Sequence, residues 1–300
     1  MAAAENTQNG VIDLADNNNV PDGVYTISSA GDYKFTCSQE TENRIAVDGK
    51  KISEQDNIKI YLDNVNINTF ASPALKIADN VKTKVTIYLT GTNNLITSAQ
   101  SSAGLQKDNG AQLIIDNSSN TTGELIAQSK YGAGIGGYSR GSSSNITISG
   151  GTVTATSTYG AGIGGGKLGT GSNITISGGS VTATSTYGAG IGGGQGGTGS
   201  NITISGGTVT ATSDLGAGIG GGQGETGSDI TISGGSVNAQ IDCTPHKNLN
   251  SSGKYDQNSP NVYLCTIPNE GNDPITIDDT PWSPYSHIAV DPDEKNCMHG

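Results

Sequence analysis

A repeat of 28 residues constrains the fold of this chain more than any other feature of its sequence. Four isoleucines recur at this interval: Ile135, Ile163, Ile191 and Ile219. Each repeat contains three short segments, GAGIGG, NITISG and TVTATS, and each segment ends on glycine or serine. A unit of this size cannot bury its apolar face alone, so the repeats must stack on one another.

Three short strands separated by three turns predict one coil of a right-handed parallel β-helix, an all-β solenoid. Stacking pairs each strand with the equivalent strands of neighbouring coils, about 4.8 Å away. A period of 30 residues continues the pattern towards the N-terminus through Leu105 and Leu75. We expect about seven coils of 28–30 residues over residues 44–241, an N-terminal cap over 1–43, and a β-rich cap or truncated module over 242–300.

Alternation along the strands assigns each side chain to the core or to the outside. Ile146 and Ile148 of NITISG should face the core, and Val153 and Ala155 of TVTATS likewise, which leaves the threonines outside. Applied to GAGIGG, the same rule puts alternate glycines outside. It predicts an outer face almost without side chains, formed by Gly132, Gly134, Gly136, Gly160, Gly162, Gly164 and their counterparts around Gly190.

Tyrosines stand at the edge of this predicted glycine face, at Tyr131, Tyr159 and Tyr187, and their spacing predicts a ladder of stacked rings. Aromatic rings beside hydroxyls and amides suit sugars, because the apolar sugar face meets the ring while sugar hydroxyls find polar partners. The predicted ligand-binding residues are Tyr131, Tyr159, Tyr187, Gly134, Gly162 and Gly190. In the alternative, the glycines only allow tight corners or a loop folded over the sheet, and the tyrosines only support one another.

Composition and charge exclude several classes of function. The net charge of −12 and the pI near 4.5 disfavour nucleic acid and anionic membranes as partners. No apolar run reaches the roughly 18 residues that predict membrane insertion. The histidines, His246, His287 and His299, lie outside the repeats, and the repeats carry few charges. A nucleophile with its base, or a pair of catalytic carboxylates, cannot be assembled on them, so we expect no enzyme.

Rows of outward threonines, such as Thr152, Thr154 and Thr156, could order water as in ice-binding solenoids. Threonine is also a common polar residue on exposed strands, and this plainer interpretation is favoured.

No cofactor is firmly predicted, although calcium is an option because carboxylate oxygens are its preferred ligands. Acids cluster at Asp13 with Asp16, at Asp278 with Asp279, and at Asp291, Asp293 and Glu294. Solvated surface is the alternative interpretation of these clusters.

The four cysteines are Cys37, Cys243, Cys265 and Cys297, without the C-x-x-C spacing of zinc or redox sites. Cys243 and Cys265 bracket a segment that a disulfide could close, and free thiols are the alternative.

The segments DNIKIYLDNVNI, SPALKIADNVKTKVTIYLTGTNNLI, GAGIGGG and NITISGGTVTA resemble the carbohydrate-binding right-handed parallel β-helix surface proteins of clostridia and related gut Firmicutes. The resemblance covers roughly residues 44–241. It implies display on the cell surface, binding of plant polysaccharides including acidic pectin-type ones, and bound calcium.

Together these features predict an extracellular, non-catalytic carbohydrate-binding or adhesive module on a bacterial cell surface. Its expected partners are a polysaccharide or host glycan and other surface proteins. The first alternative is a structural stalk or protein-binding adhesin without glycan affinity. A polysaccharide lyase and an ice-binding protein follow as less favoured alternatives.

Overall fold

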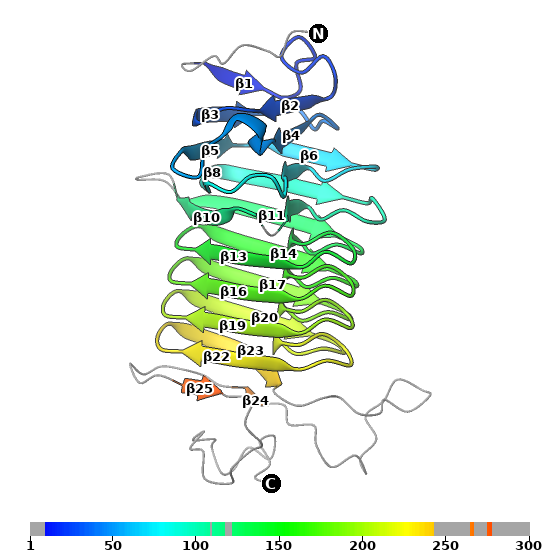
Figure 1. The fold of residues 1–300 in the computed structure, drawn as a ribbon, viewed down its shortest axis with the longest axis vertical. Helices are drawn as coiled ribbons and strands as arrows, with labels where there is room; N and C mark the ends of the chain where they lie inside the picture. The colour runs from blue at the N-terminus through cyan, green and yellow to red at the C-terminus, as the bar shows by residue number, and fades with distance from the viewer. Residues whose placement is uncertain (1–9, 109, 118–121, 243–264, 267–274, 278–300) are drawn as a thin grey trace.

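The computed structural model describes residues 10–108, 110–117, 122–242, 265–266 and 275–277. The chain winds as a solenoid of short strands stacked along one long axis (Figure 1). Within these residues the only helical element is a single 3-10 turn, Gly49–Lys51. The predicted all-β parallel solenoid is therefore confirmed.

Each coil crosses three parallel sheets, which we name B, A and C in the order in which the chain visits them. Sheet B contains β2 (Val24–Ile27), β4 (Arg44–Val47), β7 (Leu75–Ile77), β9 (Leu105–Lys107), β12 (Ile135–Gly136), β15 (Ile163–Gly164), β18 (Ile191–Gly192) and β21 (Ile219–Gly220). Sheet A contains β1 (Val11–Asp13), β3 (Gly31–Thr36), β5 (Asn57–Asp63), the first half of β8 (Lys84–Thr97), β10 (Gln112–Asn117), β13 (Ser143–Ile148), β16 (Gly171–Ile176), β19 (Gly199–Ile204) and β22 (Gly227–Ile232).

Sheet C contains β6 (Asn66–Thr69), the second half of β8, β11 (Gly123–Ser129), β14 (Thr152–Ser157), β17 (Ser180–Ser185), β20 (Thr208–Ser213) and the start of β23 (Ser236–Asp242). From β4 to β23 the chain completes seven coils, as the period predicts. Strands β24 (Cys265–Thr266) and β25 (Ile275–Ile277) add antiparallel to β23 and β22. The rest of the C-terminal segment predicted over 242–300 lies outside the described residues.

The N-terminal segment, which the sequence predicts to be a cap, contributes strands to the same sheets. Strand β2 pairs in parallel with β4, and β3 pairs in parallel with β5. Strand β1 then pairs with β3 at the end of sheet A. Parallel pairing thus begins before the first of the seven coils.

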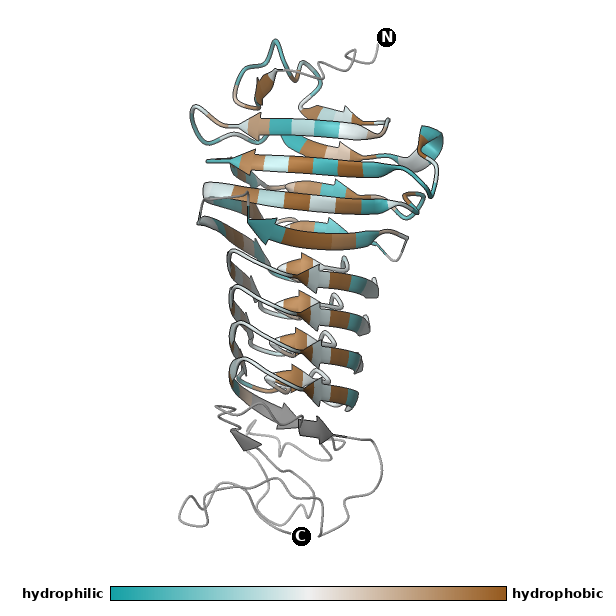
Figure 2. Cartoon of the chain, turned by 90° about the vertical axis from the view of Figure 1, so that its left-hand side faces the viewer, coloured by the Kyte–Doolittle hydropathy of each residue, from teal (hydrophilic) through white to brown (hydrophobic). Residues whose placement is uncertain are grey.

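The core consists of ladders of identical side chains. Ile163 pairs with Ile191 in sheet B, and Val153 pairs with Val181 in sheet C, and all four are at most 1% exposed. Figure 2 shows the resulting pattern, in which the same apolar bands recur at the same place in successive coils of the repeat half. The inward and outward assignments of NITISG and TVTATS are confirmed.

The prediction of an exposed glycine face is wrong. Gly134, Gly162 and Gly190 are buried. A Cβ added to Gly134 would lie 2.7 Å from the backbone nitrogen of Thr156 in sheet C, and one added to Gly162 would lie 2.7 Å from the Gly190 carbonyl oxygen. These glycines are required because backbones approach more closely than any side chain allows. Alternation fails here because each sheet B strand of the repeats has only two residues, flanked by turns.

Candidate functional site

The three predicted tyrosines lie in the turns that lead from sheet C to sheet B, one in each of three successive coils. The ring centroids of Tyr131 and Tyr159 are 4.8 Å apart with the rings 10° from parallel, and those of Tyr159 and Tyr187 are 4.9 Å apart at 7°. The predicted stacking is therefore present. All three residues are half-buried, and together we call them the tyrosine ladder.

Backbone and serine hydrogen bonds fix the spacing of this ladder. The Tyr159 N–H donates to the Lys130 carbonyl at 2.8 Å, and the Tyr187 N–H donates to the Thr158 carbonyl at 2.9 Å. Just before Tyr159, the Ser157 hydroxyl donates to the Gly132 carbonyl of the preceding coil at 2.7 Å and accepts a hydrogen bond from the Gly160 N–H at 2.9 Å. Small residues around each tyrosine thus hold the turns of neighbouring coils in register, and the rings follow.

A second row of side chains runs beside the tyrosine ladder, and the sequence reasoning missed it. The backbone N–H groups of Lys167, Gln195 and Gln223 donate to the carbonyls of Tyr131, Tyr159 and Tyr187 at 2.9, 2.8 and 2.8 Å. We call these three residues the polar row. They come from the loops KLGTGS, QGGTGS and QGETGS, in which the same position carries Lys or Gln every 28 residues. That recurrence was the signal available in the sequence.

The side chains of the polar row are available to a ligand at several atoms. The Gln195 Nε2 donates to the Gln223 Oε1 at 2.9 Å, so each amide keeps a further donor or acceptor. The Lys167 Nζ lies 4.9 Å from the ring centroid of Tyr159 and 5.9 Å from that of Tyr131. All three residues are half-exposed. The site thus offers amide and ammonium groups alongside aromatic ones.

Stacking determines which parts of the tyrosines a ligand can touch. The rings cover one another's faces, so the ring edges and hydroxyls are the parts of these half-buried tyrosines that remain for a ligand. Within the described part of the chain, the three hydroxyls have no hydrogen-bond partner. On the side of the preceding coil, the turn equivalent to that of Tyr131 carries the exposed Ser101, and the Lys130 Nζ lies 5.3 Å from the Tyr131 ring centroid. At the other end of the ladder, the position after Tyr187 is Leu215, which cannot continue the aromatic stack in the same way.

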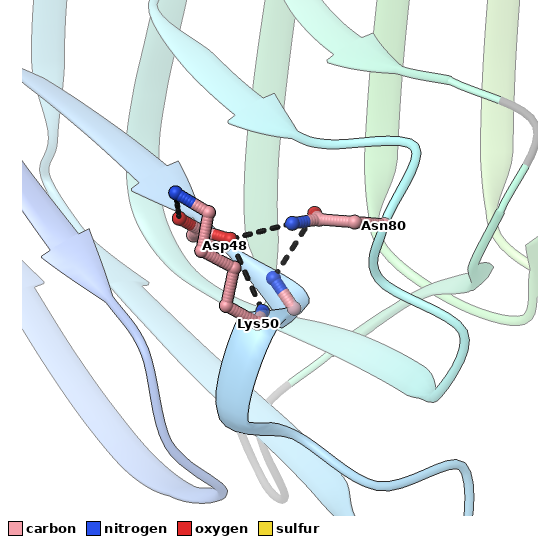
Figure 3. Close-up of polar contacts among 4 residues, drawn as sticks. Asp48, Lys50 and Asn80 are labelled. Carbon is pink, nitrogen blue, oxygen red and sulfur yellow. Dashed lines mark hydrogen bonds and ion pairs between the residues drawn. The ribbon is translucent and has the colours of Figure 1, made fainter.

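The other polar cluster that stands out is structural. The Asp48 Oδ1 accepts from the Asn80 Nδ2 at 2.6 Å and from the Lys50 N–H at 3.1 Å, and the Lys50 Nζ lies 3.5 Å from Asp48 Oδ2 (Figure 3). The Gly49 N–H donates to the Asn80 Oδ1 at 3.1 Å. The bond from Asn80 is the main cause of the lowered pKa of Asp48. These contacts fasten the turns of two neighbouring coils to each other.

Only some of the remaining sequence candidates lie within the described residues. Within the described residues, no group of three or more His, Cys, Asp or Glu is placed to hold a metal ion. The Asp13 carboxylate accepts backbone N–H groups of Ala15 and Ser38, and hydrogen bonding to Ser38 lowers its pKa. His246, His287, His299 and the acids from Asp278 to Glu294 lie outside the described residues.

Burial raises the pKa of the half-buried Cys37 thiol. Cys243 and Cys297 also lie outside, so a Cys243–Cys265 disulfide and its alternative, free thiols, both stay predictions.

The fold and the site together define a β-solenoid protein with a row of stacked tyrosines and a row of polar side chains along its axis. A family model described as carbohydrate-binding domain-containing protein matches residues 21–265, so the chain belongs to that family. No curated protein and no solved structure matches this chain. The predicted carbohydrate-binding family is thus confirmed. In the described residues no helix is long and apolar enough to cross a membrane.

Proposed function

We propose that this protein is an extracellular, non-catalytic carbohydrate-binding module of a bacterial cell surface. In this proposal a glycan lies parallel to the solenoid axis, over the tyrosine ladder and the polar row. The observation that carries the proposal is the register of these two rows, each of which advances by one residue per coil. Family membership supports carbohydrate as the ligand.

The chemistry of the two rows matches that of a sugar chain. Sugar rings have apolar C–H faces and polar hydroxyls, and the ladder offers ring edges together with tyrosine hydroxyls that can donate or accept. The polar row adds amide donors and acceptors and one ammonium donor. One further sugar ring that packs against Tyr131 would also meet the Lys130 ammonium, which lies 5.3 Å from the ring centroid. The tyrosines therefore supply apolar contact area for the sugar rings, and the polar row supplies hydrogen bonds that orient the sugar chain.

This proposed site consists of side chains already in place, so it does not need a bound calcium ion. We expect EDTA to leave glycan binding unchanged. A fall in affinity on chelation that calcium restores would assign a metal to the binding surface.

A glycan array probed with the full chain tests the proposed function. We expect signals on a related group of polysaccharides, and no release of reducing ends or unsaturated products from them. Absence of signals on every glycan would favour the structural stalk or protein-binding adhesin. Release of unsaturated products would favour the lyase.

A further inference from the structure

The outer face of sheet A carries a second group of aromatic and charged side chains, far from the tyrosine ladder. Along β5 and β8 the inward positions are fully buried, as at Ile60 and Ile87. The alternate positions face out, and they place Tyr61 directly beside Tyr88 in the register of the two strands. Their ring centroids are 5.0 Å apart and the rings lie 20° from parallel.

Charged groups lie beside Tyr61, on the side of the pair away from Tyr88. The Tyr61 hydroxyl donates to the Asp32 Oδ2 at 3.3 Å, and the Lys59 Nζ lies 3.8 Å from the same oxygen. The Lys34 Nζ lies 5.9 Å from the ring centroid of Tyr61. We call these five residues, Asp32, Lys34, Lys59, Tyr61 and Tyr88, the sheet A patch. A carboxylate has about four acceptor positions, so Asp32 can accept further hydrogen bonds.

The sheet A patch is confined to the N-terminal coils and does not follow the repeat chemistry. Further along the same sheet, the outward row that begins at Lys59 continues as Thr147, Thr175, Thr203 and Thr231. Threonine is a common residue on an exposed strand, whereas a stacked tyrosine pair with charges of both signs is not required by the fold. The Tyr88 ring also has an open side, because its neighbour in the next coil is the shorter Asp116. The patch thus offers a ring face, hydrogen-bond donors and a carboxylate acceptor.

We propose that the sheet A patch is a second carbohydrate-binding site, so that one molecule holds two glycan chains and cross-links them. One sugar ring packs on the open face of Tyr88, and the next units of the same glycan, which runs across the strands past the edge of Tyr61, reach Asp32, Lys34 and Lys59. This proposal rests on the proposed function for the class of its ligand. It adds a separate site, because the tyrosine ladder occupies the corner between sheets C and B, across the core from sheet A.

The test compares site variants of the full chain on a panel of soluble mixed-linkage β-glucan, xylan, galactomannan and polygalacturonate. The sheet A variant is Tyr61→Ala with Tyr88→Ala, and the ladder variant replaces Tyr131, Tyr159 and Tyr187 with Ala. Thr147→Ala with Thr175→Ala is the matched control on the same sheet. Calorimetric titration with an oligosaccharide of the bound polysaccharide gives the stoichiometry, and turbidity of the polysaccharide solution reports cross-linking.

We expect two oligosaccharides per wild-type and control molecule, and one per molecule of either site variant. Cross-linking should disappear in both variants. If the sheet A variant keeps the wild-type stoichiometry and turbidity, the second site is refuted, whatever the ladder variant does. If the ladder variant keeps full binding while the sheet A variant loses it, the patch binds glycan and the proposed role of the ladder is refuted.

A folding defect is separated from a binding defect in two ways. Circular dichroism and melting temperature show whether the sheet A variant keeps the β-solenoid. A second variant, Asp32→Ala with Lys59→Ala, removes only partly exposed polar groups and leaves both tyrosines in place. It should weaken the second site by at least about tenfold, because two hydrogen-bonding groups are lost. Unchanged affinity of that site in a folded variant would also contradict the proposal.

Discussion

Lys107 occupies a core position, and its replacement by methionine should stabilise the protein at neutral pH. The residue is fully buried and lies in register with Ile77 of the preceding coil. Its Nζ donates to the Asp108 carbonyl at 3.0 Å. Burial is the main reason that the pKa of Lys107 falls from 10.5 to about 8, with the nearby Asp108 and Asp79 carboxylates opposing it.

The sign of the effect follows from the two pKa values. The folded chain holds the Lys107 proton less tightly than the unfolded chain, so protonated Lys107 destabilises the fold below about pH 8. This penalty is relieved as the pH rises from about 8 to 10.5. The fall in pKa corresponds to a penalty of about 3 kcal/mol. Loss of the Nζ hydrogen bond costs about 1 kcal/mol, which leaves a net gain of about 2 kcal/mol for Lys107→Met at pH 7.

The assay is denaturant unfolding followed by circular dichroism at several pH values between 7 and 11. We expect Lys107→Met to be more stable than wild type at pH 7 and to lose this advantage above about pH 10. Lys84→Met, at an exposed position of sheet A, is the control and should show no such dependence. A stability difference for Lys107→Met that does not change with pH would refute the reasoning.

Three further predictions test the packing of the coils. Ile174→Asp should destabilise the fold by about 4 kcal/mol or more, because it buries an unpaired carboxylate, whereas Thr175→Asp on the outer face should cost less than about 1 kcal/mol in thermal unfolding. Deletion of one repeat, residues 159–186, should leave a folded, shorter solenoid, since equivalent positions are joined; loss of the β-type circular dichroism would contradict this. Gly164→Ala should lower the melting temperature more than Gly224→Ala, although φ is positive at both (+134° and +88°), because only at Gly164 would the new Cβ collide with the backbone of the next coil. An equal fall in melting temperature in the two variants would contradict this, since it would show that the coils adjust to the added methyl group.

The solenoid and its core could be predicted because both depend on period and alternation. Ile146 and Val153 recur every 28 residues in strands long enough for alternation to fix their direction. The glycines could not be placed by the same rule. Gly134 lies in a turn, where the close approach of the sheet C backbone leaves no space for a side chain.

The sequence predicts only part of the candidate site, because only some of its contacts follow the 28-residue repeat. The tyrosine ladder joins residues exactly one repeat apart, so its stacking follows from the period. The polar row contacts it across 36 residues, as from Lys167 to Tyr131, because a loop folds back on the preceding coil. This separation is not a multiple of the 28-residue repeat, so the repeat does not predict the contact. Tyr61 and Tyr88 are 27 residues apart in the irregular half of the chain, and only the strand register brings them together.

Calorimetric titration of the ladder variant tests the central claim most directly, with an oligosaccharide of the polysaccharide that the array identifies. The matched control replaces Thr154, Thr182 and Thr210 with Ala. These three threonines lie in register on the outer face of sheet C. Each lost aromatic contact should cost about 1 kcal/mol, so the ladder variant should lose about a hundredfold in affinity at the ladder site. The control should bind as wild type does. A folded ladder variant that keeps both its stoichiometry and its affinities would show that the glycan does not lie on the tyrosine ladder.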